Sequence, residues 1–285
     1  MEKGQNFILN KIFTIPYMDK IISGNNKEEF VRYVSRYVKK EDDLTYGDAI
    51  SQIYHYMDLS YRNEYYYKNT IFNQMLVKKH QLYHTAALTE LPIAGSKADF
   101  VMINGRGVVY EIKTDLDDFA RLRNQIHDYY KAFSYVNVVV GERQYDKVKE
   151  LLKDTKVGIY VLYDSGNLVP RKCAKCNRKN LSYESIFQML RRKEYESIIL
   201  KYFKKLPQVN SFYYYRECQQ QLRQLGITTL QREMQNCLKQ RTLLVVENPF
   251  DEEIPRELQF YTYFSKENRG KYEMIHKFWN EKMEV

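Results

Sequence analysis

Two acidic residues and one lysine lie close together in this sequence, around a glycine-containing turn. Asp99 belongs to one apolar run, and Glu111 and Lys113 follow in the next as Glu-Ile-Lys. The two runs, residues 98–103 and 108–112, are rich in strand-forming residues, so the segment is predicted to form a β-hairpin.

The hairpin would bring these three side chains to one place. Side chains alternate between the two faces of a strand, so Glu111 and Lys113 are expected on the same face. Asp99 would lie across from the end of the second strand. Carboxylate oxygens are the ligands that Mg²⁺ and Mn²⁺ prefer. A neighbouring ammonium can orient a water or stabilise charge growing on a phosphate, so the cluster indicates phosphodiester hydrolysis.

This arrangement resembles the PD-(D/E)XK nuclease superfamily. The core of that superfamily is a helix, a hairpin carrying Asp and Glu-x-Lys, a second helix and a further strand. The resemblance covers roughly residues 59–169, and within the superfamily it is greatest to a family of small bacterial and phage proteins. It favours phage defence or a mobile element. The one departure is Ala98, which precedes the aspartate where the superfamily name has proline.

The resemblance implies a role for each site residue. Asp99 and Glu111 would hold the metal together with the main-chain carbonyl of Ile112. Glu64, in a helix-like segment upstream, would bind the metal through water or a second ion. Lys113 would position the attacking water and steady the phosphate.

A second motif follows the hairpin. Arg121, Gln125 and Tyr129 repeat every four residues and so share one stripe of a predicted helix. They resemble the Gln-x-x-x-Tyr motif of a large branch of these nucleases, which implies that they bind substrate or hold the lysine. Ordinary surface hydrogen bonding is the alternative. Acids at positions 115, 117 and 118 suit a helix amino terminus, so the helix is expected to start there.

The segments after this helix predict an α/β fold. Residues 135–140 are almost continuously apolar, which is typical of a buried strand. A short amphipathic helix at 145–152 and another strand at 157–162 follow, and this spacing favours a mixed sheet covered by helices. By resemblance the sheet belongs to a restriction-endonuclease-like core.

Three ranges are predicted along the chain. Residues 1–58 form an N-terminal helical segment, 59–172 the nuclease core and 173–285 a mostly helical C-terminal region. Segments 181–205 and 218–241 have helical patterns, with Gly226 expected to end one helix before Thr228 or Thr229 caps the next.

Composition favours a polyanionic partner. The 285 residues carry a net charge of +9, which attracts phosphate backbones. Tyrosine is frequent, with 27 residues, and the clusters at 65–67 and 213–215 lie near basic residues. These tyrosines could stack on exposed bases, although packing into a hydrophobic core is the simpler interpretation.

Cysteine usage and hydropathy indicate the cellular compartment in which the protein works. No run approaches the roughly 20 apolar residues that a membrane span needs, and no leader pattern is present, so we expect a cytoplasmic protein. Cys173 and Cys176 would bind zinc if a second pair lay nearby. Cys218 and Cys237 are distant in sequence, so reduced thiols are the simpler interpretation and zinc stays open.

The sequence therefore predicts an Mg²⁺-dependent nuclease, with Mn²⁺ as a substitute, that acts on DNA. An RNA-cutting effector with the same site is one alternative, and a non-catalytic nucleic-acid-binding module is another. Nucleic acid is the expected partner, a second copy of the chain is a further candidate, and no membrane partner is expected.

Overall fold

The computed structural model of the chain describes residues 7–39, 42–77, 84–241, 254–265 and 270–283. By its contacts the chain divides into two compact units. Unit 1 comprises residues 1–80, 162–168 and 244–285, and unit 2 comprises residues 81–161 and 169–243. The three ranges predicted from the sequence follow a motif rather than contacts, and they stay predictions.

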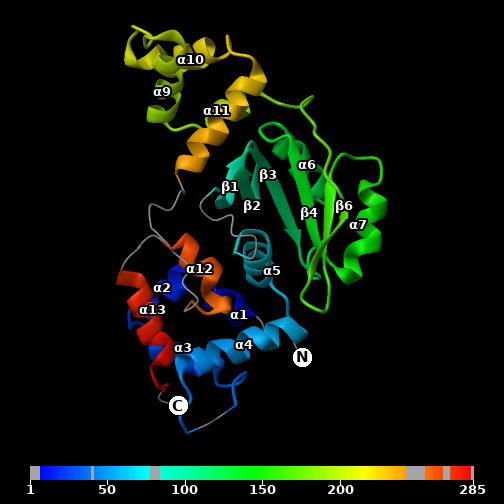
Figure 1. Cartoon of the computed structure of the whole chain (residues 1–285), viewed down its shortest axis with the longest axis vertical. Coiled ribbons are helices and arrows are strands. Elements are labelled where there is room, and N and C mark those ends of the chain that lie inside the picture. Colours follow the sequence, from blue (N-terminus) through cyan, green and yellow to red (C-terminus); the bar gives the residue numbers. More distant parts are fainter. Residues whose placement is uncertain (1–6, 40–41, 78–83, 242–253, 266–269, 284–285) are drawn as a thin grey trace. The chain divides into compact units, whose positions relative to one another are not determined.

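A six-stranded sheet forms the centre of unit 2 (Figure 1). The strands are β1 (Ala86–Ile93), β2 (Ser96–Asn104), β3 (Arg106–Lys113), β4 (Tyr135–Gly141), β5 (Gly158–Leu162) and β6 (Leu168–Lys172). Their order in the sheet is their order in the chain. β1, β2 and β3 pair antiparallel, whereas β3 and β4 pair parallel, so the predicted mixed sheet of an α/β protein is confirmed.

Helices connect the later strands, as a parallel pair requires. α6 (Leu122–Tyr130) joins β3 to β4 and packs against β2 and β4. A short 3₁₀ turn at Glu142–Gln144 and α7 (Tyr145–Leu152) join β4 to β5. Residues of β4 are buried almost throughout, because β4 lies between β3 and β5 in the sheet and because α6 and α7 pack against it.

α6 begins later than the sequence predicts. The acids at 115, 117 and 118 precede the helix instead of opening it, and Leu116 among them is exposed. Asp117 accepts hydrogen bonds of 2.8 Å from both the N–H and the hydroxyl of Thr114, and Asp118 accepts one of 2.9 Å from the Ala120 N–H. Such local side-chain bonds compete with helix formation, which explains why this prediction is wrong.

Strand β1 lies at the edge of the sheet and is not among the elements predicted from the sequence. It pairs with β2 from Ala86↔Ile103 to Ile93↔Ser96. Pro92 lies within it, and proline is tolerated in edge strands because its missing N–H leaves no interior ladder bond unmade. Glu90 has a φ of 54°, an unusual left-handed conformation for a strand residue.

Four helices complete unit 2. They are α8 (Tyr183–Gln188), α9 (Arg192–Phe203), α10 (Ser211–Leu222) and α11 (Ile227–Gln240). α10 packs against α9, and α11 packs against α8 and contacts β1 and β3. The two helical segments predicted here are confirmed. The cap of α11 is Gly226, however, rather than Thr228 or Thr229.

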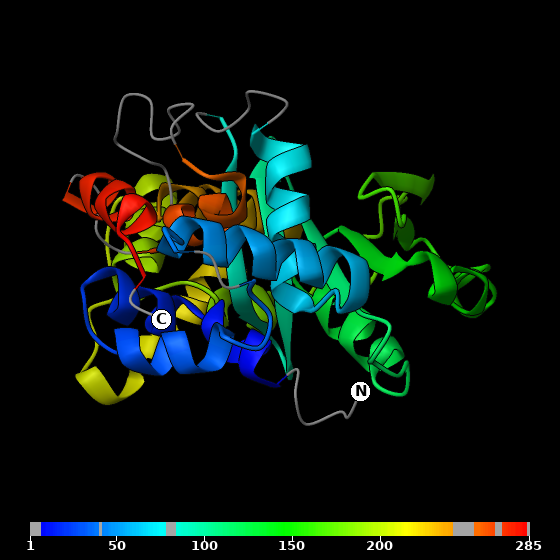
Figure 2. The same ribbon diagram turned by 90° about the horizontal axis from the view of Figure 1, so that it is seen from below.

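Unit 1 is helical and combines both ends of the chain. Its N-terminal part contains α1 (Phe7–Ile12), α2 (Ile15–Ile22), α3 (Lys27–Val34), α4 (Tyr46–Ser60), α5 (Glu64–Phe72) and a π-helical turn (Asn73–Val77); its C-terminal part contains a 3₁₀ turn (Arg256–Leu258), α12 (Gln259–Phe264) and α13 (Gly270–Asn280). α12 packs against α2 and α5, and α13 packs against α2 and α4; Figures 1 and 2 draw these helices in blue to cyan (α2, α4, α5), orange (α12) and red (α13).

Aromatic side chains fill the core of unit 1. The tyrosines at 65, 66 and 67 are all buried; the ring of Tyr65 stacks on Phe13 at 4.6 Å, and the hydroxyl of Tyr66 donates to Asp58. Packing is therefore confirmed as their role. No helix within the described ranges is long and apolar enough to span a bilayer.

Candidate functional site

Strand β2 contains Asp99, and the neighbouring strand β3 contains the Glu-Ile-Lys segment. The antiparallel ladder ends on this side with the pair Phe100↔Tyr110, so Asp99 and Glu111 are the first residues beyond its end. Oδ2 of Asp99 accepts a hydrogen bond of 2.7 Å from the N–H of Ile112. The aspartate is thus fixed beside the residue that separates Glu111 from Lys113.

Glu111 and Lys113 lie on the same face of β3, as the strand alternation predicts. Nζ of Lys113 donates to Oε1 of Glu111 at 2.8 Å. Glu111 is 1% exposed and Lys113 is 9% exposed. A carboxylate buried to this degree needs a charged or hydrogen-bonding partner, and the ammonium supplies one.

Tyr129, from α6, binds the other oxygen of Glu111. Its hydroxyl lies 2.5 Å from Oε2 of Glu111 and 2.9 Å from the main-chain oxygen of Lys97, and its single proton can go to only one of them. Burial, followed by the charge of Glu111, raises the pKa of Tyr129 far above its usual value, so this hydroxyl stays protonated and able to donate. Tyr129 holds the glutamate, whereas the sequence-based expectation was a contact with the lysine or the substrate.

Gln125 and Arg121 occupy successive turns before Tyr129. Gln125 hydrogen-bonds to Tyr129, which lowers the pKa of the tyrosine slightly against the two larger effects. Its Oε1 atom is buried and has no hydrogen-bond partner among the described residues. Arg121 stands at the N-cap position of α6 with an exposed side chain. The stripe therefore presents a buried tyrosine, a half-buried amide and an exposed guanidinium.

Glu64 belongs to unit 1, where it is the first residue of α5. Its carboxylate forms an ion pair of 2.5 Å with Lys68, one turn further along the helix, and its side chain is 54% exposed. Its part in the site stays a prediction.

Glu90 is a candidate residue that the sequence reasoning missed. The register of β1 with β2 places it opposite Asp99, and a carboxylate oxygen of each lies within 4.8 Å of the other. Glu90 also pairs with Lys97 at 3.4 Å. The signal available in the sequence was the turn at Ala94 and Gly95 between two alternating runs, which would have identified β1 as the partner of β2.

Comparison with known families gives one match. Residues 57–247 match the family described as bacteriophage P4 protein cII. The chain belongs to this family. The membership confirms the expectation of a phage or mobile-element protein, and the matched segment contains every site residue discussed above. Curated proteins and solved structures yielded no match.

The donor set of this cII-family chain fits a hard divalent cation. Asp99, Glu111 and Glu90 offer only carboxylate oxygens, which suit Mg²⁺ or Mn²⁺ rather than softer metals. Among the described residues, these three carboxylates do not all lie within 4.8 Å of one another, so the structure brings Glu90 close to Asp99 but does not assemble all three as one ligand set. Both oxygens of Glu111 already accept a hydrogen bond. An ionised carboxylate has about four lone-pair positions, so these bonds leave capacity for a further ligand.

The Cys-x-x-Cys pair of this cII-family chain follows strand β6. Cys173 is exposed and Cys176 is half-buried, and both are free thiols. Within the described part of the chain, no group of three histidine, cysteine or carboxylate side chains that includes either of them comes together at metal-binding distance.

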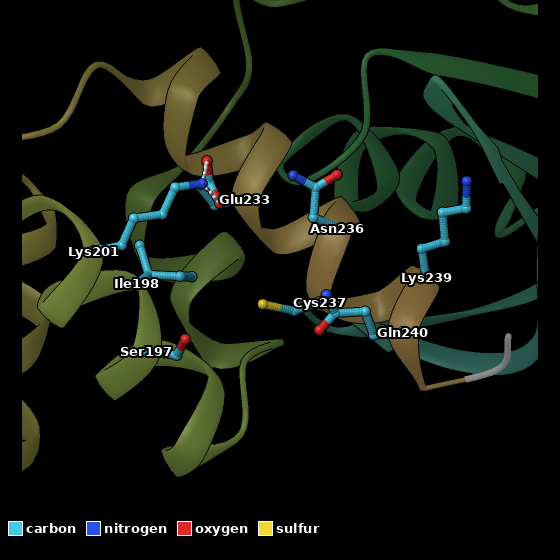
Figure 3. A pocket seen from close by; sticks show the side chains of 8 residues that line it. All are labelled: Ser197, Ile198, Lys201, Glu233, Asn236, Cys237, Lys239 and Gln240. Carbon is cyan, nitrogen blue, oxygen red and sulfur yellow. Dashed lines mark hydrogen bonds and ion pairs between the residues drawn. The ribbon is translucent and has the colours of Figure 1, made fainter.

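A cavity of about 430 Å³ lies between α9 and α11 (Figure 3). Lys201 donates to both oxygens of Glu233 at 2.9 Å, so the charges of this pair compensate each other. Burial raises the pKa of the Cys237 thiol to about 11, which keeps the thiol protonated and poorly nucleophilic at neutral pH. The residues of this cavity therefore offer no evident chemistry.

Proposed function

We propose that this protein is a metal-dependent nuclease that hydrolyses phosphodiester bonds in DNA. The observation that carries the proposal is the cluster of side chains where the antiparallel ladder of β2 and β3 ends, beyond Phe100↔Tyr110. There Asp99 is bonded to the N–H of Ile112, between Glu111 and Lys113, while Tyr129 from the following helix is bonded to Glu111.

The order of elements supports the PD-(D/E)XK assignment. An antiparallel hairpin carries the aspartate and the Glu-x-Lys motif, a helix with Gln-x-x-x-Tyr follows, and the next strand pairs parallel to the second strand of the hairpin. The resemblance stated for the sequence implies this order. The matched phage family is compatible with phage defence or a mobile element.

In this proposal, Asp99 and Glu111 hold Mg²⁺, or Mn²⁺ in its place, with the carbonyl of Ile112 and with Glu64 as a further ligand. When bound, such a cation lowers the pKa of a water and offsets charge on the phosphate. Glu90, opposite Asp99, adds a third carboxylate of unit 2 to the same edge of the sheet.

The remaining residues position the reacting groups and bind the substrate. Lys113 places a positive charge beside Glu111, where it orients the attacking water and meets charge developing on the phosphate. Tyr129 fixes the orientation of the Glu111 carboxylate through its hydroxyl. Arg121 is exposed and can contact a neighbouring phosphate, and Gln125 offers an amide oxygen without a partner among the described residues.

The test is cutting of nucleic acid by the purified full chain. Supercoiled plasmid, linear duplex DNA, single-stranded DNA and RNA are incubated in Mg²⁺, Mn²⁺ or EDTA with the native protein, Lys113→Ala and Lys153→Ala. We expect metal-dependent cutting that falls about a hundredfold or more in Lys113→Ala, the size of loss typical for one preorganised charge at a reacting phosphate or carbonyl.

Lys153→Ala is the matched control, because Lys153 also pairs with a glutamate but is 58% exposed. It should cut like the native protein. Cutting of RNA alone would favour the effector alternative. If the native protein binds nucleic acid but does not cut it in any of the metals, the result would contradict the enzyme assignment and support the binding-module alternative.

A further inference from the structure

A cavity of about 280 Å³ lies in unit 2 at the turn between β2 and β3. Three arginines line it from three separate segments: Arg106 from the turn, Arg178 from the segment after β6, and Arg232 from α11. No aspartate or glutamate is among its lining residues. We call it the arginine cavity.

None of these arginines forms an ion pair within the part of the chain that the structure describes. Arg232 does interact electrostatically with its neighbour Glu233, but the carboxylate of Glu233 is hydrogen-bonded to Lys201. Arg178 and Arg232 are exposed. Arg106 is also exposed, and its guanidinium lies 4.6 Å from the centre of the Tyr135 ring, which orients the group without neutralising it. The cavity between α9 and α11 differs, because there Lys201 is paired with Glu233.

Buried hydrogen bonds hold the wall formed by α11 in place. Gln231 is buried; it accepts a bond of 3.0 Å from the Ser134 hydroxyl and donates one of 2.8 Å to the Ala132 carbonyl. One turn later, Gln235 accepts a bond of 3.1 Å from the N–H of Gly107. These bonds join α11 to β3 and to the segment before β4, so Arg232 is carried on a fixed support.

The other two walls are fixed in a similar way. The main-chain N–H of Asn177 donates to the Ser134 carbonyl at 2.8 Å, which anchors the residue just before Arg178. Arg106 starts β3 and is paired with Asn104 across the turn. Thr228 and Thr229, in the first turn of α11, add hydroxyl groups to the lining.

We propose that the arginine cavity binds a backbone phosphate of the nucleic acid on which the protein acts. Guanidinium groups match phosphate oxygens with paired hydrogen bonds and keep their charge at any physiological pH, and the lining hydroxyls add neutral donors. A net charge of +9 favours the same polyanion. The identity of the ligand as nucleic acid rests on the proposed function, whereas the preference for phosphate rests on the three arginines.

The arginine cavity lies far enough along β3 from the acidic residues to contact a phosphate other than the one that is cut. Arg106 and Glu111 are at opposite ends of the same strand. Five residues of strand span about 17 Å at roughly 3.4 Å each, which equals about five base pairs of duplex rise. A short duplex is therefore long enough to reach from the acidic residues to the arginine cavity.

Binding without cutting separates this inference from the proposed function. A fluorescent 20-base-pair duplex is titrated in EDTA with the full chain and with Arg178→Ala, Arg232→Ala and the double variant, at several salt concentrations. Arg216→Ala is the matched control, because Arg216 is an exposed arginine of α10 that does not line the cavity.

We expect each cavity variant to weaken binding about tenfold, as the loss of one charged hydrogen-bonding group does, and the double variant to weaken it further. The slope of log affinity against log salt should fall by about 0.9 for each lost phosphate contact. Arg216→Ala should bind like the native protein.

Equal affinity and slope for the native protein and the double variant would overturn the inference. A competition experiment then identifies the source of the phosphate. We expect unlabelled duplex to displace the fluorescent duplex, and inorganic phosphate at the same phosphate concentration to leave it bound. Displacement by inorganic phosphate but not by unlabelled duplex would overturn the binding of a backbone phosphate. Arginine-dependent binding by the native protein, without metal-dependent cutting, would count against the nuclease and not against the cavity.

Discussion

The Tyr129 hydroxyl has two acceptors and one proton, and one of those acceptors is the carboxylate at the centre of the candidate site. Its neighbour Tyr130 is also buried, but the Tyr130 hydroxyl has no hydrogen-bond partner among the described residues. The two tyrosines therefore form a natural pair for separating the effect of a hydroxyl from the effect of a buried ring.

Tyr129→Phe should lower the rate of cutting about tenfold or more through kcat, with KM little changed, because the hydroxyl orients Glu111 rather than the substrate. It should also lower the free energy of unfolding by about 1–2 kcal/mol, since a buried carboxylate loses a donor. Tyr130→Phe should change neither quantity appreciably. Steady-state kinetics and urea unfolding of both variants provide the check, and equal behaviour of the two would contradict the assigned role.

Glu90 combines a left-handed backbone with a carboxylate opposite Asp99. Glu90→Gly should raise the free energy of unfolding by about 1 kcal/mol, because glycine adopts a positive φ without the steric cost that other residues have. Glu90→Gln keeps the conformation and removes only the charge, so it serves as the control. Urea unfolding measures the difference; a glycine variant no more stable than the glutamine variant would show that the backbone is not strained there.

At the scale of elements, the sequence specified those parts whose pattern is local. The hairpin of β2 and β3, the buried strand β4 and the amphipathic helix α7 follow from alternation, continuous apolarity and helical periodicity. The start of α6 was wrong because side-chain bonds around Thr114 compete with helix formation. β1 was missed because an edge strand containing Pro92 has a weak strand pattern.

The same reasoning explains which parts of the candidate site were predictable. Glu111 and Lys113 share a face because they are two residues apart on a strand, which needs no tertiary information. The contact of Tyr129 with Glu111 depends on how α6 crosses the sheet, and the position of Glu90 depends on the pairing of β1. Sequence spacing contains neither relation.

Gly107 leaves no room for a side chain between β3 and two of its neighbours, Phe133 and Gln235 of α11. A Cβ atom at this position would lie 2.7 Å from the ring of Phe133, which is fully buried. Gly107→Ala should therefore lower the free energy of unfolding by about 2 kcal/mol, as overpacking of a filled core does. Gly226→Ala is the control, since its Cβ would have no neighbour closer than 3.9 Å. Urea unfolding should show a loss in the free energy of unfolding of less than about 1 kcal/mol for the control. Equal losses for the two variants would contradict the close contact of Gly107 with Phe133.

At the scale of the whole molecule, the two units contain different residues that can report on their unfolding. The single tryptophan, Trp279, lies in α13 of unit 1, whereas all four cysteines, at positions 173, 176, 218 and 237, lie in unit 2. Cys218 is fully buried. Tryptophan fluorescence therefore reports on unit 1, and protection of the Cys218 thiol reports on unit 2.

Gly47→Ala should lower the midpoint of the fluorescence transition in urea, because its Cβ would lie 2.6 Å from the ring of Trp279 in the packing of α4 against α13. The loss should amount to about 1–3 kcal/mol. Gly107→Ala should instead lower the urea concentration at which Cys218 becomes reactive to a thiol reagent. A fluorescence transition unchanged by Gly47→Ala would contradict the packing of Trp279 against α4.

The discontinuity of unit 1 has a consequence for the order of folding during synthesis. Strands of the sheet pair in chain order, and unit 2 ends at residue 243, so its contacts are all available before residues 244–285 are made. Unit 1 needs α12 and α13 from those residues to cover α2, α4 and α5. These three helices are therefore made before unit 2 but covered only after it, and in the interval their exposed aromatic side chains are prone to aggregation.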